Sequence, residues 1–226
     1  MDDNLMLIKQ FQMQDGKKGA EAAFAEEYRN YQQIQNVYMG AIREIRARLE
    51  TLDTEFQYRH KHNPIHHIQS RVKTLPSIMK KLSDMGQPMT ITSAKKHLHD
   101  IAGVRVVCCY VDDISLIVEK DYIQPPKPNG YRSLHIVVDV PVYLSQGKLF
   151  IPVEIQIRTV AMDFWATLEH GIRYKSSDEV PAFIVDELRN CADVITRTDA
   201  KMQEIFKALQ LLNDKEDDFH WRSSED

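Results

Sequence analysis

The chain has 226 residues, of which 43% are hydrophobic and 27% are charged, and its formal net charge is −4. This composition predicts one core-forming domain with helical additions and argues against a disordered chain. The acidic balance argues against a protein that coats nucleic acid through bulk electrostatics, because duplex binding needs a strongly basic face. Any anionic ligand must therefore be bound by a local cluster of cations.

We expect a cytoplasmic protein that does not associate with a membrane. No apolar run approaches the roughly eighteen residues that cross a bilayer, and the start MDDNLMLIKQ lacks the basic and apolar regions of a signal peptide. Cys108, Cys109 and Cys191 have the spacing of neither a disulfide framework nor a metal site. We interpret them as small core residues.

The segment from Gly19 to Gln57 is rich in helix formers with apolar residues near helical spacing, which predicts one long amphipathic helix or two. Pro64 makes a continuous helix unfavourable through the histidine-rich segment that follows, QYRHKHNPIHHIQ. Its histidines lack acidic or cysteine partners at a recognisable spacing. We therefore expect a solvated linker, partly facing phosphate, rather than a zinc site.

The middle of the chain predicts a sheet. A helix is expected after Pro76 and should end at Gly86, and Ile101 to Val111 is typical of a buried strand. Further short strands are expected in LIVEKDYI, RSLHIVVDVPVYL and KLFIPVEIQIRT, the last two joined by a hairpin turn at Gly147. The fold class is therefore α+β, with helices flanking one central sheet.

Helical spacing returns in AMDFWATLEHGIRYK and again after Pro181, which suits a first helical turn. Apolar residues recur in threes and fours in the last helix. This stripe suits either an oligomer interface or packing on the chain's own sheet, and it comprises Leu188, Cys191 or Ala192, Ile195, Met202, Ile205, Leu209 and Leu212.

One loop, PPKPNGYRSLH, combines stiffening prolines with Gly130, which permits close backbone approach. Tyr131 is suited to stack on a base, and neighbouring side chains are suited to bind phosphate or sugar: Lys127, Asn129, Arg132 and His135. A turn with a solvated tyrosine explains the loop equally well. Upstream, Ser77 and Lys81 share a helix face that suits a polyphosphate, although an ordinary cationic helix is the alternative.

Two carboxylates stand out. Asp100 enters a buried strand, which is costly unless it is hydrogen-bonded, caps a helix or holds a cation such as Mg²⁺. Strand alternation places Glu154, Gln156 and Arg158 on one face, which could equally face solvent. If that face opens near Asp100, the carboxylates can share Mg²⁺, or one can hold the metal while the other takes a proton from a hydroxyl.

In order, the segments RVKxxxSIxxK, HDIAGVRVVC, KDYIxxPKPNGYRSLH, VEIQIRT and MDFWATLEH closely resemble the synthetase domain of the RelA/SpoT superfamily, the enzymes that make guanosine tetra- and pentaphosphate. The resemblance spans Arg71 to His170 and lacks the hydrolase and regulatory domains of long members, so the chain is similar to a stand-alone small alarmone synthetase. It implies a nucleotidyltransferase-like fold with a mixed sheet and terminal helical extensions. The expected regions are residues 1–60 (helical), 61–175 (synthetase core) and 176–226 (C-terminal helix and polar tail).

The resemblance also implies an activity of the stringent response, transfer of the β,γ-pyrophosphate of ATP to the 3′-hydroxyl of GDP or GTP with release of AMP. Arg71 and Arg105 would sandwich adenine, and Asp100 would hold Mg²⁺. Glu154 would activate the 3′-hydroxyl or assist the metal, and Tyr131 would stack on guanine. The remaining roles are contacts to ATP phosphates by Lys73, Ser77 and Lys81, and to the guanosine nucleotide by Lys127, Asn129, His135, Gln156 and Arg158.

Relatives of this kind form homotetramers through terminal helices, and some respond to their alarmone product or to single-stranded RNA. Two departures from the family occur here. Thr74 replaces a serine of many long relatives but retains the hydroxyl. Asp113 and Leu116 lie closer together than the family pattern, too close for the roughly dozen-residue crossover between parallel strands, so either a loop is deleted or residues are missing from the sequence.

Two other functions compete. An HD-type phosphohydrolase would use His99 and Asp100, but it needs further His and Asp ligands from helices, whereas here the pair opens directly into a strand. An RNA-binding regulator would use Lys127, Tyr131 and Arg132 as a stacking and phosphate platform. The net acidity and Asp100 argue against that regulator.

Overall fold

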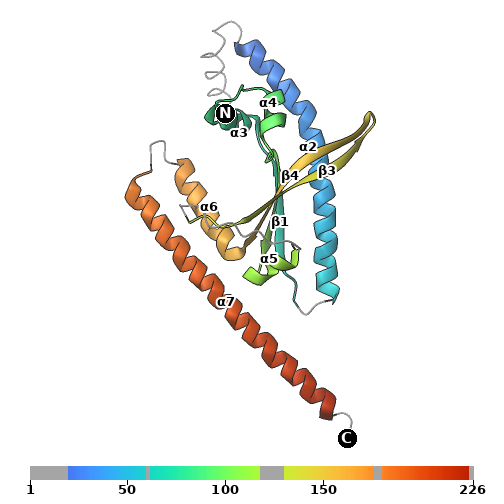
Figure 1. The fold of residues 1–226 in the computed structure, drawn as a ribbon, viewed down its shortest axis with the longest axis vertical. Helices are drawn as coiled ribbons and strands as arrows, with labels where there is room; N and C mark the ends of the chain where they lie inside the picture. Colours follow the sequence, from blue (N-terminus) through green and yellow to red (C-terminus); the bar gives the residue numbers. More distant parts are fainter. Residues whose placement is uncertain (1–19, 60–61, 118–129, 176–179, 224–226) are drawn as a thin grey trace. The chain divides into compact units, whose positions relative to one another are not determined.

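The computed structural model describes residues 20–59, 62–117, 130–175 and 180–223 (Figure 1). Long helices stand near both ends of this part of the chain, and the strands lie between them in sequence. The elements in chain order are α2 (Ala20–Arg59), β1 (Ile65–Val72), α3 (Leu75–Asp84), α4 (Ile91–His97), β2 (Ala102–Cys108), α5 (Val111–Ile117), β3 (Leu134–Leu144), β4 (Gly147–Thr159), α6 (Val160–Lys175) and α7 (Ala182–Ser223).

The strands form one four-stranded sheet in the order β1-β2-β4-β3. Backbone hydrogen bonds from Lys73 N to Ile101 O (2.7 Å) and from Cys109 N to Pro64 O (3.2 Å) pair opposite ends of β1 and β2, which are therefore antiparallel. The β3–β4 hairpin turns at Gly147, whose φ of +133° suits glycine. With β2 and β4 as the parallel pair, the sheet is mixed, as the resemblance implied.

The prediction of a solvated linker at the histidine-rich segment is wrong for its last five residues, because Ile65–Val72 is strand β1. Strand β2 pairs with this edge strand along one side, so the backbone forms a strand although the side chains are polar. His62, just before the strand, also has an acidic partner that spacing did not reveal. Its Nε2 lies 2.9 Å from Asp113 Oδ1.

The strand expected in LIVEKDYI is also wrong where it can be checked, because Leu116 and Ile117 end helix α5 and the rest of that segment lies outside the described residues. Asp113 explains the helix, since its Oδ2 accepts a hydrogen bond from Tyr110 N (2.9 Å) at the first turn. The short junction from Asp113 to Leu116 is therefore one continuous helix that follows β2.

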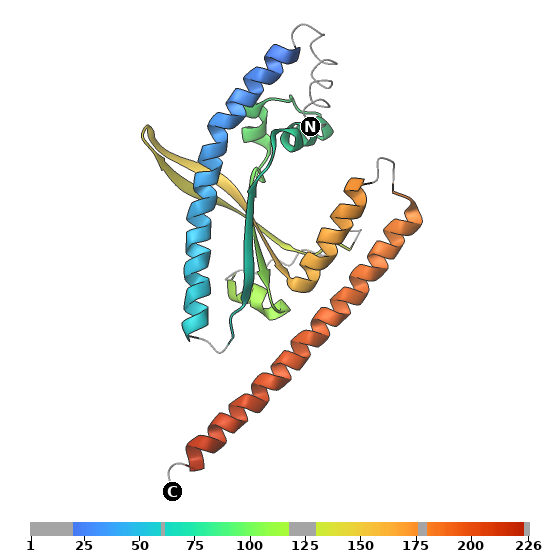
Figure 2. The ribbon, with the colours of Figure 1, turned by 180° about the vertical axis from the view of Figure 1, so that it is seen from behind.

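The described residues belong to two compact units, and the first comprises Met1–Thr54, Ile68–Arg105 and His135–Gln156. Here α2 is a single long helix that runs beside the sheet in both views (Figures 1 and 2). Tyr31 Oη donates to Lys73 O at 3.1 Å. The core of this unit includes the buried side chains of Ile42, Ile78, Met79, Leu82, Val104 and Val153.

The second unit comprises Glu55–His67, Val106–Leu134 and Ile157–Asp226. Helices α6 and α7 pack together, with Trp165 and Ala192 buried between them, and Trp165 Nε1 donates to Leu188 O (2.9 Å). Helix α7 also contacts α5, where Lys207 Nζ lies 2.6 Å from Asp112 Oδ2. None of the described helices is long and apolar enough to pass through a membrane.

The apolar stripe predicted in the last helix divides in two. Leu188 and Ile195 pack against the Trp165 and Ala192 cluster. Further along α7, the stripe is exposed at Met202, Ile205, Leu209 and Leu212. The first half therefore packs on α6, and the second half has no cover among the described residues.

Candidate active site

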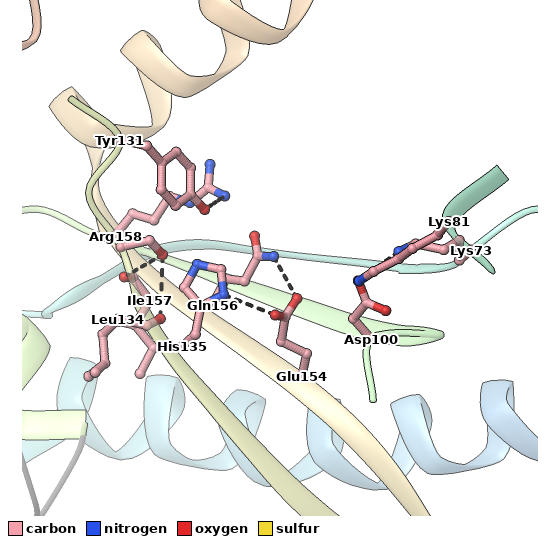
Figure 3. A network of polar contacts seen from close by, with 11 residues as sticks. Lys73, Lys81, Asp100, Tyr131, Leu134, His135, Glu154, Gln156, Ile157 and Arg158 are labelled. Carbon is pink, nitrogen blue, oxygen red and sulfur yellow. Dashed lines mark hydrogen bonds and ion pairs between the residues drawn. The ribbon is translucent and has the colours of Figure 1, made fainter. Parts of the chain in front are cut away.

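The first group of contacts in the candidate site is built around Asp100, immediately before β2. Its Oδ2 accepts hydrogen bonds from Lys73 Nζ, just after β1, and from Lys81 Nζ, on α3, both at 2.6 Å (Figure 3). Burial by itself would raise the pKa of Asp100, but the hydrogen bonds and charges of the two lysines outweigh it and lower the pKa. Asp100 is therefore ionised at neutral pH.

The other oxygen of this carboxylate is suited to a cation. Asp100 Oδ1 is buried and has no hydrogen-bond partner among the described residues. Such an atom is costly unless a ligand satisfies it. Within the described ranges no group of three or more His, Cys, Asp or Glu side chains could hold a metal, so a cation here would need substrate oxygens as further ligands, which is the usual manner of Mg²⁺.

Helix α3 presents hydroxyl groups and a cation next to this carboxylate. Thr74 is its N-cap and accepts from Ser77 N at 3.4 Å, and the two hydroxyl oxygens lie 2.9 Å apart. Pro76 suits the first turn, where its missing N–H costs nothing. Ser77 and Lys81 lie one turn apart, and Thr74 supplies the hydroxyl expected of it.

Arg71 and Arg105 come from neighbouring strands. On β1, alternation places Arg71 on the same face as Gln69, and Arg105 on β2 donates to Gln69 Oε1 at 3.4 Å. This cross-strand contact brings both arginines to one face of the sheet. An adenine held between the two guanidinium groups stays a prediction.

The second group of contacts joins β3 to β4. Glu154 Oε1 lies 2.9 Å from His135 Nδ1, and Glu154 Oε2 accepts from Gln156 Nε2 at 2.7 Å (Figure 3). The hydrogen bond with His135 is the largest influence on the pKa of Glu154 and lowers it, and Gln156 adds to this effect. Burial and the negative charge of Asp100 act in the opposite direction but do not prevail.

Because the charge of Asp100 acts on Glu154, the two carboxylates of this unit lie within electrostatic range of each other. Both are nevertheless ionised at neutral pH, because each has its own hydrogen-bond donors. Two ionised carboxylates beside lysines can hold a divalent cation or accept a proton. The polar face expected from strand alternation is therefore confirmed for Glu154 and Gln156, which contact each other.

The third group of contacts lies in the other unit and contains Tyr131. Arg158 Nη2 donates to Tyr131 Oη at 2.7 Å, and Arg158 Nη1 donates to Asp163 Oδ1 at 3.1 Å. The guanidinium carbon lies 5.2 Å from the centroid of the tyrosine ring. Ser133 Oγ donates to Ile157 O at 3.2 Å, which ties the segment after Tyr131 to β4.

Comparison with known proteins identifies the family. Residues 70–179 match the region found in RelA / SpoT proteins. The chain is 44% identical over 186 residues to the GTP pyrophosphokinase YwaC of Bacillus subtilis, covering 76% of this chain and 89% of that protein. The chain belongs to the RelA/SpoT family.

Other RelA/SpoT relatives agree. The GTP pyrophosphokinase YjbM of Bacillus subtilis is 36% identical over 186 residues, covering 76% of this chain and 87% of that protein. The crystal structure of small alarmone synthetase 1 from Bacillus subtilis bound to its product pppGpp superimposes with a TM-score of 0.74 at 34% identity. That match covers 80% of this chain and 98% of the other, which bears out the α+β fold class.

In this RelA/SpoT chain, the structure places most of the predicted site residues and leaves two unplaced. Lys73, Lys81 and Asp100 are in direct contact, as are His135, Glu154 and Gln156. Lys127 and Asn129 lie outside the described residues. Arg158 is placed but almost fully buried, with 4% of its side chain exposed.

Sequence reasoning missed Asp163, which binds Arg158, and Asp199, which accepts from Thr159 Oγ1 at 2.6 Å. Asp163 lies in the family segment MDFWATLEH but was given no role there, and Asp199 lies outside the family segments. Asp163 also falls in the first turn of a predicted helix, where an acidic residue is common for reasons unrelated to a site.

Proposed function

We propose that this chain transfers the β,γ-pyrophosphate of ATP to the 3′-hydroxyl of GDP or GTP and releases AMP, and is thus a (p)ppGpp synthetase. The observation that carries the proposal is the paired arrangement of Asp100 and Glu154. One carboxylate is bonded to two lysines, the other to a histidine and an amide, and both are ionised. Relatives named GTP pyrophosphokinase and a structure bound to pppGpp support the same reaction.

The donor nucleotide is assigned to the lysine side of the site. Lys73 and Lys81 are compact cations that suit phosphate oxygens, and Ser77 adds a hydroxyl one turn from Lys81. In the structure both lysines bind Asp100. When ATP binds, each lysine can donate hydrogen bonds to phosphate oxygens as well as to Asp100. Arg71 and Arg105 are suited to stack on adenine.

Asp100 would hold Mg²⁺ through its buried Oδ1, with Glu154 as a second candidate ligand. Mg²⁺, when bound, supplies positive charge that neutralises the phosphate oxygens and polarises the transferred group. Asp100 is kept ionised by its lysines, so the residue presents a negative ligand at neutral pH. The lysines balance the local charge when no nucleotide is present.

The roles in binding the acceptor nucleotide follow, residue by residue, from the family resemblance. Tyr131 stacks on guanine, and the sugar or phosphates are bound by His135, Gln156, Lys127 and Asn129. The lowered pKa of Glu154 keeps its carboxylate ionised and able to accept a hydrogen bond from the 3′-hydroxyl. The bonds from His135 and Gln156 hold that carboxylate in one orientation.

In the transfer step, one bond to phosphorus forms and one breaks. The 3′-oxygen of the acceptor forms a bond to the β-phosphorus of ATP, and the bond between that phosphorus and the α,β-bridging oxygen breaks. AMP leaves with the bridging oxygen, and Glu154 accepts the proton of the 3′-hydroxyl. Lys73 and Lys81 stabilise the negative charge that develops on the transferred and leaving phosphates.

Assembly as a homotetramer is part of the proposal. The exposed stripe of Met202, Ile205, Leu209 and Leu212 on α7 supports association, because such a row is costly to leave in water.

The test is incubation of the purified protein with ATP, Mg²⁺ and either GDP or GTP, with nucleotides separated by ion-exchange chromatography. AMP and a guanosine nucleotide carrying a 3′-pyrophosphate should appear in equal amounts, and chelation of Mg²⁺ should stop the reaction. Release of ADP or inorganic phosphate in place of AMP would contradict the proposed transfer.

A further inference from the structure

We infer that Asp163 is a positioning residue for the acceptor nucleotide, because it holds the Arg158 guanidinium and Arg158 in turn holds the hydroxyl of Tyr131. This inference rests on the proposed function, in which guanine stacks on Tyr131. It assigns a role to a residue of the segment MDFWATLEH that had been given none. It also changes the role of Arg158 from a nucleotide contact to a support of the stacking ring.

Because Arg158 is buried, its guanidinium contacts other side chains of the protein rather than a ligand. Only 4% of its side chain is exposed, so its guanidinium is not free to reach a ligand in solution. Nη2 is directed to Tyr131 Oη at 2.7 Å and Nη1 to Asp163 Oδ1 at 3.1 Å. A buried guanidinium needs a nearby negative charge, and Asp163 supplies it. Asp163 therefore determines where Arg158 points.

The position of Asp163 is itself well defined. It lies in the first turn of α6, and the start of this helix is fixed by Thr159 Oγ1, which accepts from Met162 N at 3.1 Å. The Thr159 hydroxyl donates to the buried carboxylate of Asp199 on α7 at 2.6 Å. The carboxylate of Asp163 is thus held by a helix end that is anchored to a second helix.

Tyr131 is supported from its other end by apolar packing. Its ring is partly buried against Trp165 and Ala192, and the preceding Gly130 lies against Ala192. With the body of the ring packed and its hydroxyl held by Arg158, few orientations remain for the side chain. When a base stacks on a ring that is already ordered, binding costs less side-chain entropy than when the ring must first become ordered.

These contacts predict an effect on the acceptor alone. Of the residues assigned to ATP, Lys73 and Lys81 contact Asp100, whereas Asp163 contacts Arg158. Loss of the support should raise KM for GDP by roughly threefold to tenfold, the factor expected when one flexible side chain must be ordered on binding. KM for ATP should stay within about twofold, because no donor contact changes.

The experiment compares Asp163→Asn, Tyr131→Phe and the double variant in initial-rate assays that vary GDP and ATP separately. Tyr131→Phe keeps the ring and removes only the hydroxyl that Arg158 binds. Because it leaves the Arg158–Asp163 pair in place, this variant still tests the inference if Asp163→Asn fails to fold. Asp186→Asn is the matched control, because it makes the same change in an exposed ion pair, with Arg189 on α7. Isothermal titration with GDP measures affinity independently of turnover.

We expect each single variant to raise KM for GDP, the double variant to add little to the larger single effect, and Asp186→Asn to match the wild type. GDP affinity should weaken by the same factor. Equal changes in the two KM values, effects that multiply in the double variant, or unchanged GDP affinity would overturn the inference. A wild type that binds GDP but releases no AMP would count against the proposed function alone, and the titration would still decide the role of Asp163.

Discussion

A methyl group added at Gly130 tests how closely the segment before Tyr131 lies against α7. Gly130 has a φ of +89°, a conformation that residues with a side chain adopt at a cost. A Cβ built on it would lie 2.6 Å from the Cβ of Ala192, which is buried in the cluster with Trp165. Gly130→Ala therefore combines backbone strain with a steric clash.

The magnitude follows from these two contributions. The left-handed backbone costs about 1–2 kcal/mol for a residue with a Cβ, and overpacking of a dense interior costs about 1–3 kcal/mol. The sum for Gly130→Ala is about 2–5 kcal/mol of unfolding free energy. In a protein of 226 residues, about 1 kcal/mol lowers Tm by roughly 2–4 °C. We therefore expect Tm to fall by roughly 4–20 °C.

Thermal unfolding followed by circular dichroism measures this fall, and Gly86→Ala separates the two contributions. Gly86 also has a positive φ, +65°, but nothing lies within 4 Å of its built Cβ. Gly86→Ala should therefore show the backbone cost alone. Ala192→Gly, combined with Gly130→Ala, removes the clashing methyl and should recover part of the loss, apart from the roughly 1 kcal/mol cost of a helical glycine.

Two results would contradict the close packing of Gly130 on Ala192. The first is a Gly130→Ala protein that is destabilised no more than the Gly86→Ala protein. The second is a Gly130→Ala protein to which Ala192→Gly adds the full helical glycine cost, because a relieved clash must offset that cost. Either result would show that Gly130 does not lie against Ala192.

Three further predictions concern carboxylates. Glu154→Gln should abolish AMP release while calorimetry shows nucleotide binding largely intact, because it removes a charge but little volume, and full activity would remove Glu154 from catalysis. Asp100→Asn should abolish Mg²⁺-dependent transfer and lower Tm by several degrees, because Lys73 and Lys81 lose their shared counter-charge, and retained Mg²⁺-dependent activity would contradict its metal role. Burial raises the pKa of Asp199 above its ordinary 3.8. The folded state therefore binds the proton more tightly than the unfolded state, which stabilises the fold. This stabilisation is fully present below about pH 3.8 and is lost as the pH rises through the raised pKa. Asp199→Asn, which keeps an acceptor for Thr159, should therefore raise Tm more at pH 8 than at pH 4, and an equal or opposite change at the two pH values would argue against that sign.

Local chemistry in the sequence was enough to predict several contacts of the candidate site. Thr74 and Pro76 signal the start of α3, and the helical spacing then places Ser77 and Lys81 one turn apart. Alternation along β4 places Glu154 and Gln156 on one face, and the structure shows their side chains in contact. These features depend on neighbours within a few residues, so the periodicity of helix and strand is sufficient to predict them.

Prediction failed in two places, one decided by a distant partner and the other by a local capping bond. The segment from Ile65 to Val72 has a polar, histidine-rich composition, and it becomes a strand because β2 lies beside it and pairs with its backbone along one side. Leu116 and Ile117 look like a strand by composition, but a carboxylate of the same helix, Asp113, binds the backbone at the helix start. Tertiary pairing outweighs local preference in the first case, and a local capping bond does so in the second.

By itself, the sequence determined the fold class and the family, because these depend on residue types and spacings that the chain carries directly. Only the tertiary structure decided that Asp100 binds two lysines through one oxygen and leaves the other without a hydrogen-bond partner among the described residues. Only the structure likewise showed Gly130 against Ala192 and Arg158 between Tyr131 and Asp163. Except for Arg158 and Asp163, which are five residues apart, these contacts join residues far apart in the chain. Burial, charge balance and close packing select them only once the chain has folded.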